Sequence, residues 1–215
     1  MKKQSILFLC AHNDDHIIGA GGTIIKYAKD GNEIFTIVFS YGESSHPHFK
    51  REFAVQMRVK ESFDAAKILG EERMTYLGLK EGRFLDDFKR KRLARKLRNI
   101  INEKQPTKIF THSVDDPHPD HQAVYGIVTQ LVDKMRFKGD VYCFDVWNPI
   151  TITTRSLPRL VVDISDTFGL KMKAMRAHKS QILARLSLFW NLYAKAFLNG
   201  MRYDVRYAEV FYKIR

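Results

Sequence analysis

The sequence has few cysteines, no long apolar run and no convincing pattern of a secretory signal near residue 1, and each of these observations narrows the expected class of protein. The two cysteines, Cys10 and Cys143, form no CxxC pair, and each lies in an apolar, strand-like run. We therefore expect buried thiols in a reducing compartment rather than a disulfide framework. No stretch reaches the roughly 18 apolar residues that a membrane-spanning helix needs. Only about six apolar residues follow Lys2 and Lys3, which is too short for a secretory signal. We expect a cytoplasmic protein and leave peripheral contact with a membrane open.

The length and composition are typical of a globular protein with a sizeable core. The chain has 215 residues, of which 45% are hydrophobic and 28% are charged, and we expect one domain spanning residues 1–215. The formal net charge is +12. This excess favours acidic partners such as nucleic acid, anionic lipid headgroups or a phosphate-bearing substrate, but it does not choose among them.

Apolar runs and turn residues predict strands that alternate with helices. The predicted strands are residues 5–9, 33–40, 74–77, 108–111, 141–147, 160–164 and 207–213. The predicted helices are residues 22–29, 53–69, 84–101, 122–135, 167–179 and 182–198. This order predicts an α/β fold with a single doubly wound, mostly parallel, Rossmann-like sheet flanked by helices. In the common strand order 3-2-1-4-5, the first and fourth strands are neighbours, and ligands bind between their C-terminal ends.

Two loops rich in carboxylates and imidazoles follow the first and the fourth predicted strands. They read CAHNDDH at residues 10–16 and VDDPHPDH at residues 114–121. Such a cluster is costly to hold together unless a cation or a reaction uses it. Each loop alone is also typical of a turn or a helix cap. Their coincidence at neighbouring strand ends favours a metal site.

Three side chains of these loops form a candidate ligand set for a divalent metal. His12, Asp15 and His121 would leave a fourth position for water, as catalytic zinc sites do. Asp14 is adjacent to a ligand but is expected to point elsewhere, so it is the candidate general base for that water. A protonated His118 would stabilise an oxyanion or protonate a leaving amine.

The other histidines and acids of the loops are expected in supporting or ordinary positions. Asp120 is a candidate to support catalysis by orienting one of the imidazoles, without itself being a metal ligand. His16 is as consistent with an exposed loop residue as with a ligand. His46, His48 and His112 are expected to be ordinary surface or loop residues.

Five motifs resemble, in the right order, those of the PIG-L/LmbE-like de-N-acetylases. The first loop and the GGT at residues 21–23 resemble the opening AHPDD motif with its glycines, and HPDH at residues 118–121 matches the second motif. RVKE at residues 58–61, AHKSQ at 177–181 and YAEVF at 207–211 resemble the R-x-x-E, A-x-H-x-S-Q and Y-A-E-x-F elements. The match covers nearly the whole chain.

The resemblance implies zinc-dependent removal of an acetyl group from an N-acetylglucosamine-like sugar. It implies metal ligands at His12, Asp15 and His121, a general base at Asp14 and a catalytic histidine at His118. These residues agree with the set chosen from the loops themselves. Ferrous iron would fit the same ligands as zinc.

The resemblance also points to one further site residue, and the sequence differs from the family's first motif at two places. Arg58 is a candidate substrate contact, or else it pairs structurally with Glu61. Asn13 stands where relatives usually have proline, and His16 and Ile17 stand where an acidic residue is common. Neither departure removes a group that the chemistry needs.

Two stretches of the sequence are candidates for binding an anionic surface. One is the basic run KRKR at residues 89–92 with further basic residues at 95, 96 and 98, and the other is the aromatic run SLFWNLYAKAF at residues 187–197. A solvated helix face and a helix packed on the sheet explain them simply. Together they also suggest contact with an anionic membrane, which would suit a phosphate-linked or lipid-linked amino sugar.

The alternative hypothesis is a basic nucleic-acid-binding or anionic-surface-binding protein without this catalysis. No nucleic-acid-binding motif is recognised in the sequence, and this alternative leaves the two metal-like loops unexplained. A zinc deaminase is disfavoured because its H-x-E and P-C-x-x-C signature is absent. A homo-oligomer is left open.

Overall fold

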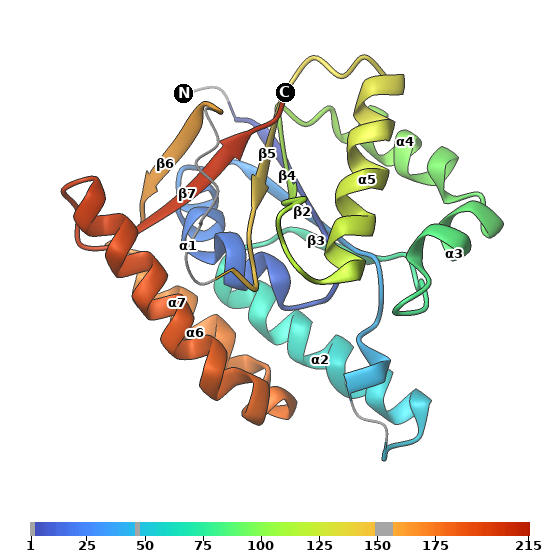
Figure 1. Cartoon of the computed structure of the whole chain (residues 1–215), viewed down its shortest axis with the longest axis horizontal. Helices are drawn as coiled ribbons and strands as arrows, with labels where there is room; N and C mark the ends of the chain where they lie inside the picture. Colours follow the sequence, from blue (N-terminus) through green and yellow to red (C-terminus); the bar gives the residue numbers. More distant parts are fainter. Residues whose placement is uncertain (1–2, 46–47, 149–156) are drawn as a thin grey trace.

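The computed structural model describes residues 3–45, 48–148 and 157–215. These residues form a seven-stranded sheet in the order β3-β2-β1-β4-β5-β7-β6, with helices on both faces (Figure 1). Strands β1 to β5 pair in parallel, and β7 pairs antiparallel with β5 and β6. The predicted mostly parallel, doubly wound sheet and its order 3-2-1-4-5 are confirmed. The antiparallel edge is an addition that the alternation of elements did not indicate.

The strands and helices follow one another along the chain as expected, with shifted ends. The strands are β1 (Ser5–Cys10), β2 (Glu33–Val38), β3 (Arg73–Tyr76), β4 (Lys108–His112), β5 (Asp140–Phe144), β6 (Arg159–Asp163) and β7 (Ala208–Lys213). The helices are α1 (Asp15–Lys29), α2 (Arg51–Leu69), α3 (Phe84–Arg90), α4 (Leu93–Lys104), α5 (Pro119–Lys134), α6 (Phe168–Ala177) and α7 (Ile182–Arg202). Short 3-10 turns are η1 (Glu43–Ser45) and η2 (Lys179–Gln181).

The central strand β1 shows why the sheet is covered on both faces. Its side chains alternate, so Ile6 and Phe8 pack into one core with α1, α2, α6 and α7, while Leu7 and Leu9 pack into another with α3, α4 and α5. All four side chains are fully buried. A strand that is apolar on both faces therefore belongs in the middle of the sheet.

Helix α1 begins at Asp15, well before the predicted start at residue 22. The glycines that suggested a turn lie inside this helix because other elements approach its backbone closely. A Cβ atom at Gly19 would lie 2.2 Å from Cδ2 of Phe144, and one at Gly22 would lie 2.7 Å from Cβ of Ile164. The early start places the end of the first acidic loop in the first turn of a helix.

Other differences from the predicted elements are local. The predicted helix over residues 84–101 is two helices, α3 and α4, because Arg92 adopts a left-handed backbone with φ of 51°. Helix α5 begins at Pro119 rather than at residue 122 because His118 caps it.

The two cysteines are buried thiols that form no disulfide bond, as predicted. Among the helices of the described chain, none combines the length and the apolarity that crossing a membrane requires. The single domain over residues 1–215 and the cytoplasmic location stay predictions.

Candidate active site

The candidate site lies where β1 and β4 end, side by side in the middle of the sheet. Their parallel register pairs Phe8 with Phe110, so the loops that follow Cys10 and His112 leave the sheet at the same edge. This edge is the one at which open α/β sheets bind ligands. The first loop leads into α1 and the second into α5.

The three predicted metal ligands converge at this edge. The ligand atoms of His12, Asp15 and His121 all lie within 4.8 Å of one another. Oδ2 of Asp15 is 3.4 Å from Nδ1 of His12, and Oδ1 of Asp15 is 3.4 Å from Nε2 of His121. The same two imidazole nitrogens are 3.3 Å apart. Two imidazoles and a buried carboxylate are the donor chemistry that zinc and ferrous iron accept, so these residues fit a divalent metal.

The charges around this cluster favour a cation. Burial by itself disfavours ionisation of Asp15, but His121, His112 and His12 hold its pKa well below the usual range. Burial lowers the pKa of His121, yet Asp15 and Asp116 outweigh it and raise that pKa to about 9. In the protein alone, protons on the imidazoles supply the positive charge that these buried carboxylates require. A metal ion would supply the same charge.

His112 belongs to the site, so its prediction as an ordinary surface or loop residue is wrong. The side chain is fully buried, and its Nε2 accepts a hydrogen bond of 2.9 Å from the backbone N–H of Ala11. The same nitrogen lies 3.2 Å from Oδ2 of Asp15, and the ring stacks on His121 with centroids 4.0 Å apart. Burial lowers the pKa of His112 to about 4, so the imidazole is neutral. Its place as the last residue of β4 is the only sequence signal.

Asp116 is a second site residue to which the sequence assigned no role. Its Oδ1 lies 3.0 Å from Nδ1 of His121, and its Oδ2 accepts a hydrogen bond of 2.8 Å from the backbone N–H of Val146. Burial opposes ionisation, but the hydrogen bond and the charge of His121 bring the pKa of Asp116 to about 2. A carboxylate in this position holds the proton on Nδ1 and leaves Nε2 for a metal. A signal was present, because this aspartate lies in the same acidic loop.

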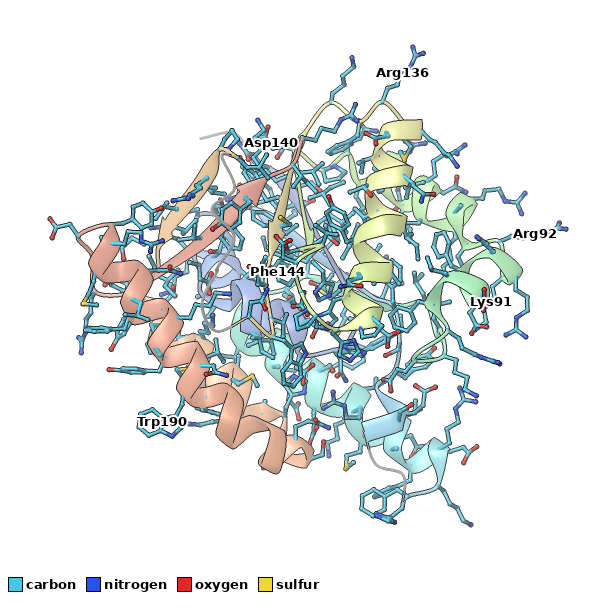
Figure 2. All side chains as sticks on the ribbon, in the orientation of Figure 1. Lys91, Arg92, Arg136, Asp140, Phe144 and Trp190 are labelled. Atoms are coloured by element: carbon cyan, nitrogen blue, oxygen red, sulfur yellow. The ribbon has the colours of Figure 1, made fainter. Side chains whose placement is uncertain are left out.

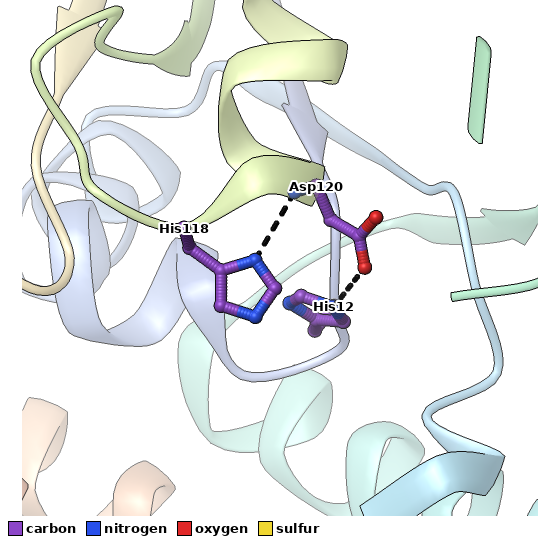
Figure 3. Close-up of side chains that lie close together, drawn as sticks. All are labelled: His12, His118 and Asp120. Carbon is purple, nitrogen blue, oxygen red and sulfur yellow. Dashed lines mark hydrogen bonds and ion pairs between the residues drawn. The ribbon is translucent and has the colours of Figure 1, made fainter. Parts of the chain in front are cut away.

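His118 and Asp120, both at the start of α5, lie close to His12, as Figure 3 shows. His118 caps α5, and its Nδ1 accepts a hydrogen bond of 3.1 Å from the backbone N–H of Asp120. Burial, then the charges of His121 and His12, lower the pKa of His118, which favours a neutral ring. Oδ2 of Asp120 lies 3.4 Å from Nε2 of His12. Asp120 therefore has the contact expected of a residue that orients an imidazole.

Asp14 contacts the arginine that the sequence singled out. Its Oδ2 lies 3.5 Å from Nη2 of Arg58, and the same guanidinium donates a hydrogen bond to Oδ1 of Asn13. Asn13 in turn donates a hydrogen bond of 3.1 Å to the backbone carbonyl of Arg58. Asn13 thus has a structural role beside Asp14. Glu61 accepts hydrogen bonds from the backbone and hydroxyl of Ser180 at 2.7 Å instead of pairing with Arg58.

The remaining histidines of the loops lie away from the ligand cluster. His16 is fully buried rather than exposed, and its Nε2 lies 3.4 Å from Oε1 of Glu71. Burial lowers the pKa of His16 and raises the pKa of Glu71. A carboxylate from a distant part of the chain thus lies beside His16. His48 is exposed, as predicted, and His46 lies outside the described residues.

A doubly wound α/β sheet with a cluster of imidazoles and carboxylates at its central strand ends defines the class: a Rossmann-like α/β protein with a candidate metal site. The chain belongs to the PIG-L family. Residues 7–132 match the family described as GlcNAc-PI de-N-acetylase. A relative from Bacillus cereus, named probable N-acetyl-alpha-D-glucosaminyl L-malate deacetylase 2, is 30% identical over 201 residues, which cover 86% of each chain. The family is thus a family of deacetylases whose named members act on GlcNAc-type substrates.

Solved structures share the whole fold. N,N'-diacetylchitobiose deacetylase from Pyrococcus horikoshii superposes with a TM-score of 0.82 and 24% identity, covering 99% of this chain and 84% of the other. GalB, the 4-carboxy-2-hydroxymuconate hydratase from Pseudomonas putida, superposes with a TM-score of 0.83 and 21% identity, covering 99% of this chain and 96% of the other. Because the second enzyme is a hydratase, the fold alone does not decide the reaction.

Proposed function

We propose that this protein is a metal-dependent hydrolase that removes the N-acetyl group from an N-acetylglucosamine-type sugar or sugar conjugate. The observation that carries the proposal is the convergence of His12, Asp15 and His121 within 4.8 Å, at the C-terminal edge of the sheet. Relatives that act on GlcNAc-type substrates support the choice of acetyl sugar.

His12, Asp15 and His121 are the proposed ligands, with Zn²⁺ as the proposed metal and Fe²⁺ as the alternative. A metal bound there would lower the pKa of a water molecule and polarise the acetyl carbonyl. Asp116 would hold the ring of His121 through the contact of 3.0 Å, and the neutral ring of His112 would stack on that of His121 at 4.0 Å.

Asp14 is the proposed general base, and its oxygen atoms would accept the proton of the attacking water. Nη2 of Arg58 lies 3.5 Å from Oδ2 of Asp14 and would keep this carboxylate in position. Arg58 is only 2% exposed, so its contacts favour this positioning role over the direct substrate contact that the resemblance implies.

His118 is the proposed hydrogen-bond donor to the substrate. Because its Nδ1 accepts from the backbone of Asp120, a neutral ring carries its proton on Nε2. That N–H can stabilise the oxyanion that forms on the acetyl oxygen, and the proton that Asp14 takes from the water can then pass to the leaving amine. Asp120 also contacts His12, so it would fix the position of His118 relative to that proposed ligand.

Acetate release from N-acetylglucosamine compounds tests this function. We expect release that is lost after chelation, regained with added metal, and lost in Asp14→Ala. Asp64→Ala is the matched control, because that carboxylate is 52% exposed and lies on the surface of α2. Full activity of Asp14→Ala would overturn the assignment of the base. A gel shift with nucleic acid at physiological salt tests the alternative, and we expect none.

We also propose peripheral contact with an anionic membrane through α7. This helix exposes an apolar stripe of Trp190, Tyr193, Phe197, Leu198 and Met201, of which Trp190 is the most exposed at 77%. Their spacing places them on one face of the helix. Exposed Trp and Tyr side chains on such a face are typical of helices that lie at a membrane surface.

The basic run that the sequence joined to this stripe lies elsewhere. Figure 2 places Lys91 and Arg92 at the right of the molecule and Trp190 at the left. A flat membrane that contacts α7 would therefore leave α3 and α4 in solution. The side chains of residues 187 and 188 lie outside the described part. Sedimentation with anionic vesicles tests the contact: we expect binding that weakens with salt and in Trp190→Ala, and no binding at low salt would overturn it.

A further inference from the structure

A cationic recess lies beside the candidate active site, between the start of α2 and helix α3. It has a volume of about 530 Å³, which is large enough for a substituent of sugar size. Five basic and two acidic side chains line it, so its charge is positive. Arg51 comes from α2, Lys80 and Arg83 come from the loop after β3, and Arg90 comes from the end of α3.

Much of the charge in the recess is already paired. Asp87 lies 2.6 Å from Arg90 and 3.6 Å from Lys91, and its Oδ2 also accepts the backbone N–H of Lys80 at 3.1 Å. Arg51 pairs with a glutamate of the preceding loop at 2.9 Å. These contacts fix the wall of the recess and leave other cations to act on a ligand.

Lys80 and Arg83 are the cations that remain. Within the described residues, neither has a carboxylate within 4.0 Å, and both side chains are exposed. Asp86 is the only other acidic residue of the lining, and it offsets one of the two positive charges. An arginine fork and a lysine ammonium that line the same recess suit phosphate or carboxylate oxygens.

The recess and the candidate active site share a wall. The backbone N–H of Gly82 donates to both carboxylate oxygens of Asp120, at 2.9 and 3.1 Å. On the other side of Arg83, the ring of Phe84 lies 6.1 Å from the ring of His12. Arg83 is thus flanked along the chain by two residues that contact the site. A substrate whose acetyl group lies at His12 could extend its other end into the recess.

We propose that the recess binds an oxyanion, a phosphate or a carboxylate, carried by the group to which the amino sugar is attached. This rests on the proposed function and narrows its substrate class to anionic conjugates. The sugar would lie over the metal cluster with its acetyl group at Asp14 and His118, and the anion would lie between Lys80 and Arg83. Because both cations are exposed, their effect will be moderate and will weaken with salt.

Deacetylation kinetics with three substrates test the proposal: N-acetylglucosamine, its 1-phosphate and its L-malate conjugate. We expect a higher kcat/KM for the two anionic substrates, and the comparison of phosphate with malate identifies which oxyanion is preferred. In the double variant Lys80→Ala/Arg83→Ala, kcat/KM for the preferred anionic substrate should fall about tenfold, since each exposed charge pair contributes a few-fold. The value for N-acetylglucosamine should not change.

The matched control is Lys89→Ala/Arg95→Ala, which removes two exposed cations of α3 and α4 that do not line the recess. It should leave all three values unchanged. Equal loss in the two double variants would show a general effect of net charge and would overturn the proposal. So would an unchanged preference for anionic substrates in Lys80→Ala/Arg83→Ala.

Calorimetric binding of N-acetylglucosamine 1-phosphate separates this proposal from the proposed function. If no substrate is deacetylated, the proposed function fails, but binding that is lost in Lys80→Ala/Arg83→Ala still supports the recess. If N-acetylglucosamine is deacetylated and the 1-phosphate binds the wild type and the double variant equally, the recess is overturned and the function stands.

Discussion

Oδ1 of Asp116 lies 3.0 Å from Nδ1 of His121, on the edge of the ring opposite to the one that faces Asp15. A neutral imidazole that binds a metal through Nε2 carries its proton on Nδ1, and this carboxylate can accept a hydrogen bond from that N–H group. The buried aspartate thus fixes both the orientation and the tautomer of a proposed ligand.

Asp116→Asn should therefore weaken metal binding about 10- to 100-fold, which is the usual effect of removing such a partner. Competition with a chromophoric chelator measures the affinity. Asp64→Asn on the surface of α2 is the control and should bind as the wild type does. Unchanged affinity in Asp116→Asn would show that His121 needs no such partner.

Asp14→Asn should separate metal binding from catalysis. The amide cannot accept the proton of the attacking water, so kcat should fall about 10²- to 10⁴-fold. The metal content, measured by elemental analysis, should stay that of the wild type because Asp14 is not a proposed ligand. Loss of the metal in this variant would instead assign Asp14 to the ligand set.

Arg58→Lys tests how the base is positioned. Lysine keeps the positive charge but cannot contact Asn13 and Asp14 through one planar group, as the guanidinium does. We expect a lower kcat with a KM close to that of the wild type. A raised KM with unchanged kcat would favour the direct substrate contact.

A buried ion pair connects the closing strand β7 to helix α6. Nζ of Lys171 lies 2.7 Å from Oε1 of Glu209, and both side chains are at most 5% exposed. The carboxylate also accepts the backbone N–H groups of Gly22 and Thr23. Glu209→Gln leaves the lysine charge buried without its partner, so stability should fall by about 3–5 kcal/mol. Urea denaturation measures the loss, and an exposed substitution, Glu103→Gln, should change little.

Two glycine substitutions test the close packing of α1. A Cβ at Gly22 would lie 2.7 Å from Ile164, whereas a Cβ at Gly126 in α5 meets nothing within 4 Å. Gly22→Ala should therefore lower the free energy of unfolding by about 1–3 kcal/mol. Gly126→Ala should raise it by about 0.5–1 kcal/mol because alanine favours the helix. If both substitutions changed the free energy of unfolding in the same direction, close packing around Gly22 would not explain its effect.

The order of the strands could be predicted from the sequence because each central strand is apolar on both faces. Helix ends, helix breaks and edge-strand pairing were predicted less well, because contacts between distant parts of the chain determine them. The glycines of α1 looked like a turn because nothing local shows that Phe144 and Ile164 pack against them. The break at Arg92 depends on one backbone conformation within an otherwise helical pattern. The antiparallel pairing of β7 depends on long-range neighbours.

The candidate site was predicted where its residues lie in motifs. His12, Asp15 and His121 belong to two short loops whose spacing is informative. His112 and Asp116 act through burial and through contacts with those residues, and a sequence does not show such contacts. His16 is similar: its partner Glu71 is distant in sequence, and only the fold brings the two side chains together.

Metal titration of the chelator-stripped protein, followed by acetate release from N-acetylglucosamine conjugates at each point, tests the central claim most directly. We predict that activity rises in step with bound zinc or iron and saturates at about one metal per chain, as a single catalytic site requires. Asp14→Asn should bind the same amount of metal without releasing acetate. Full acetate release from protein that holds no metal would contradict the account.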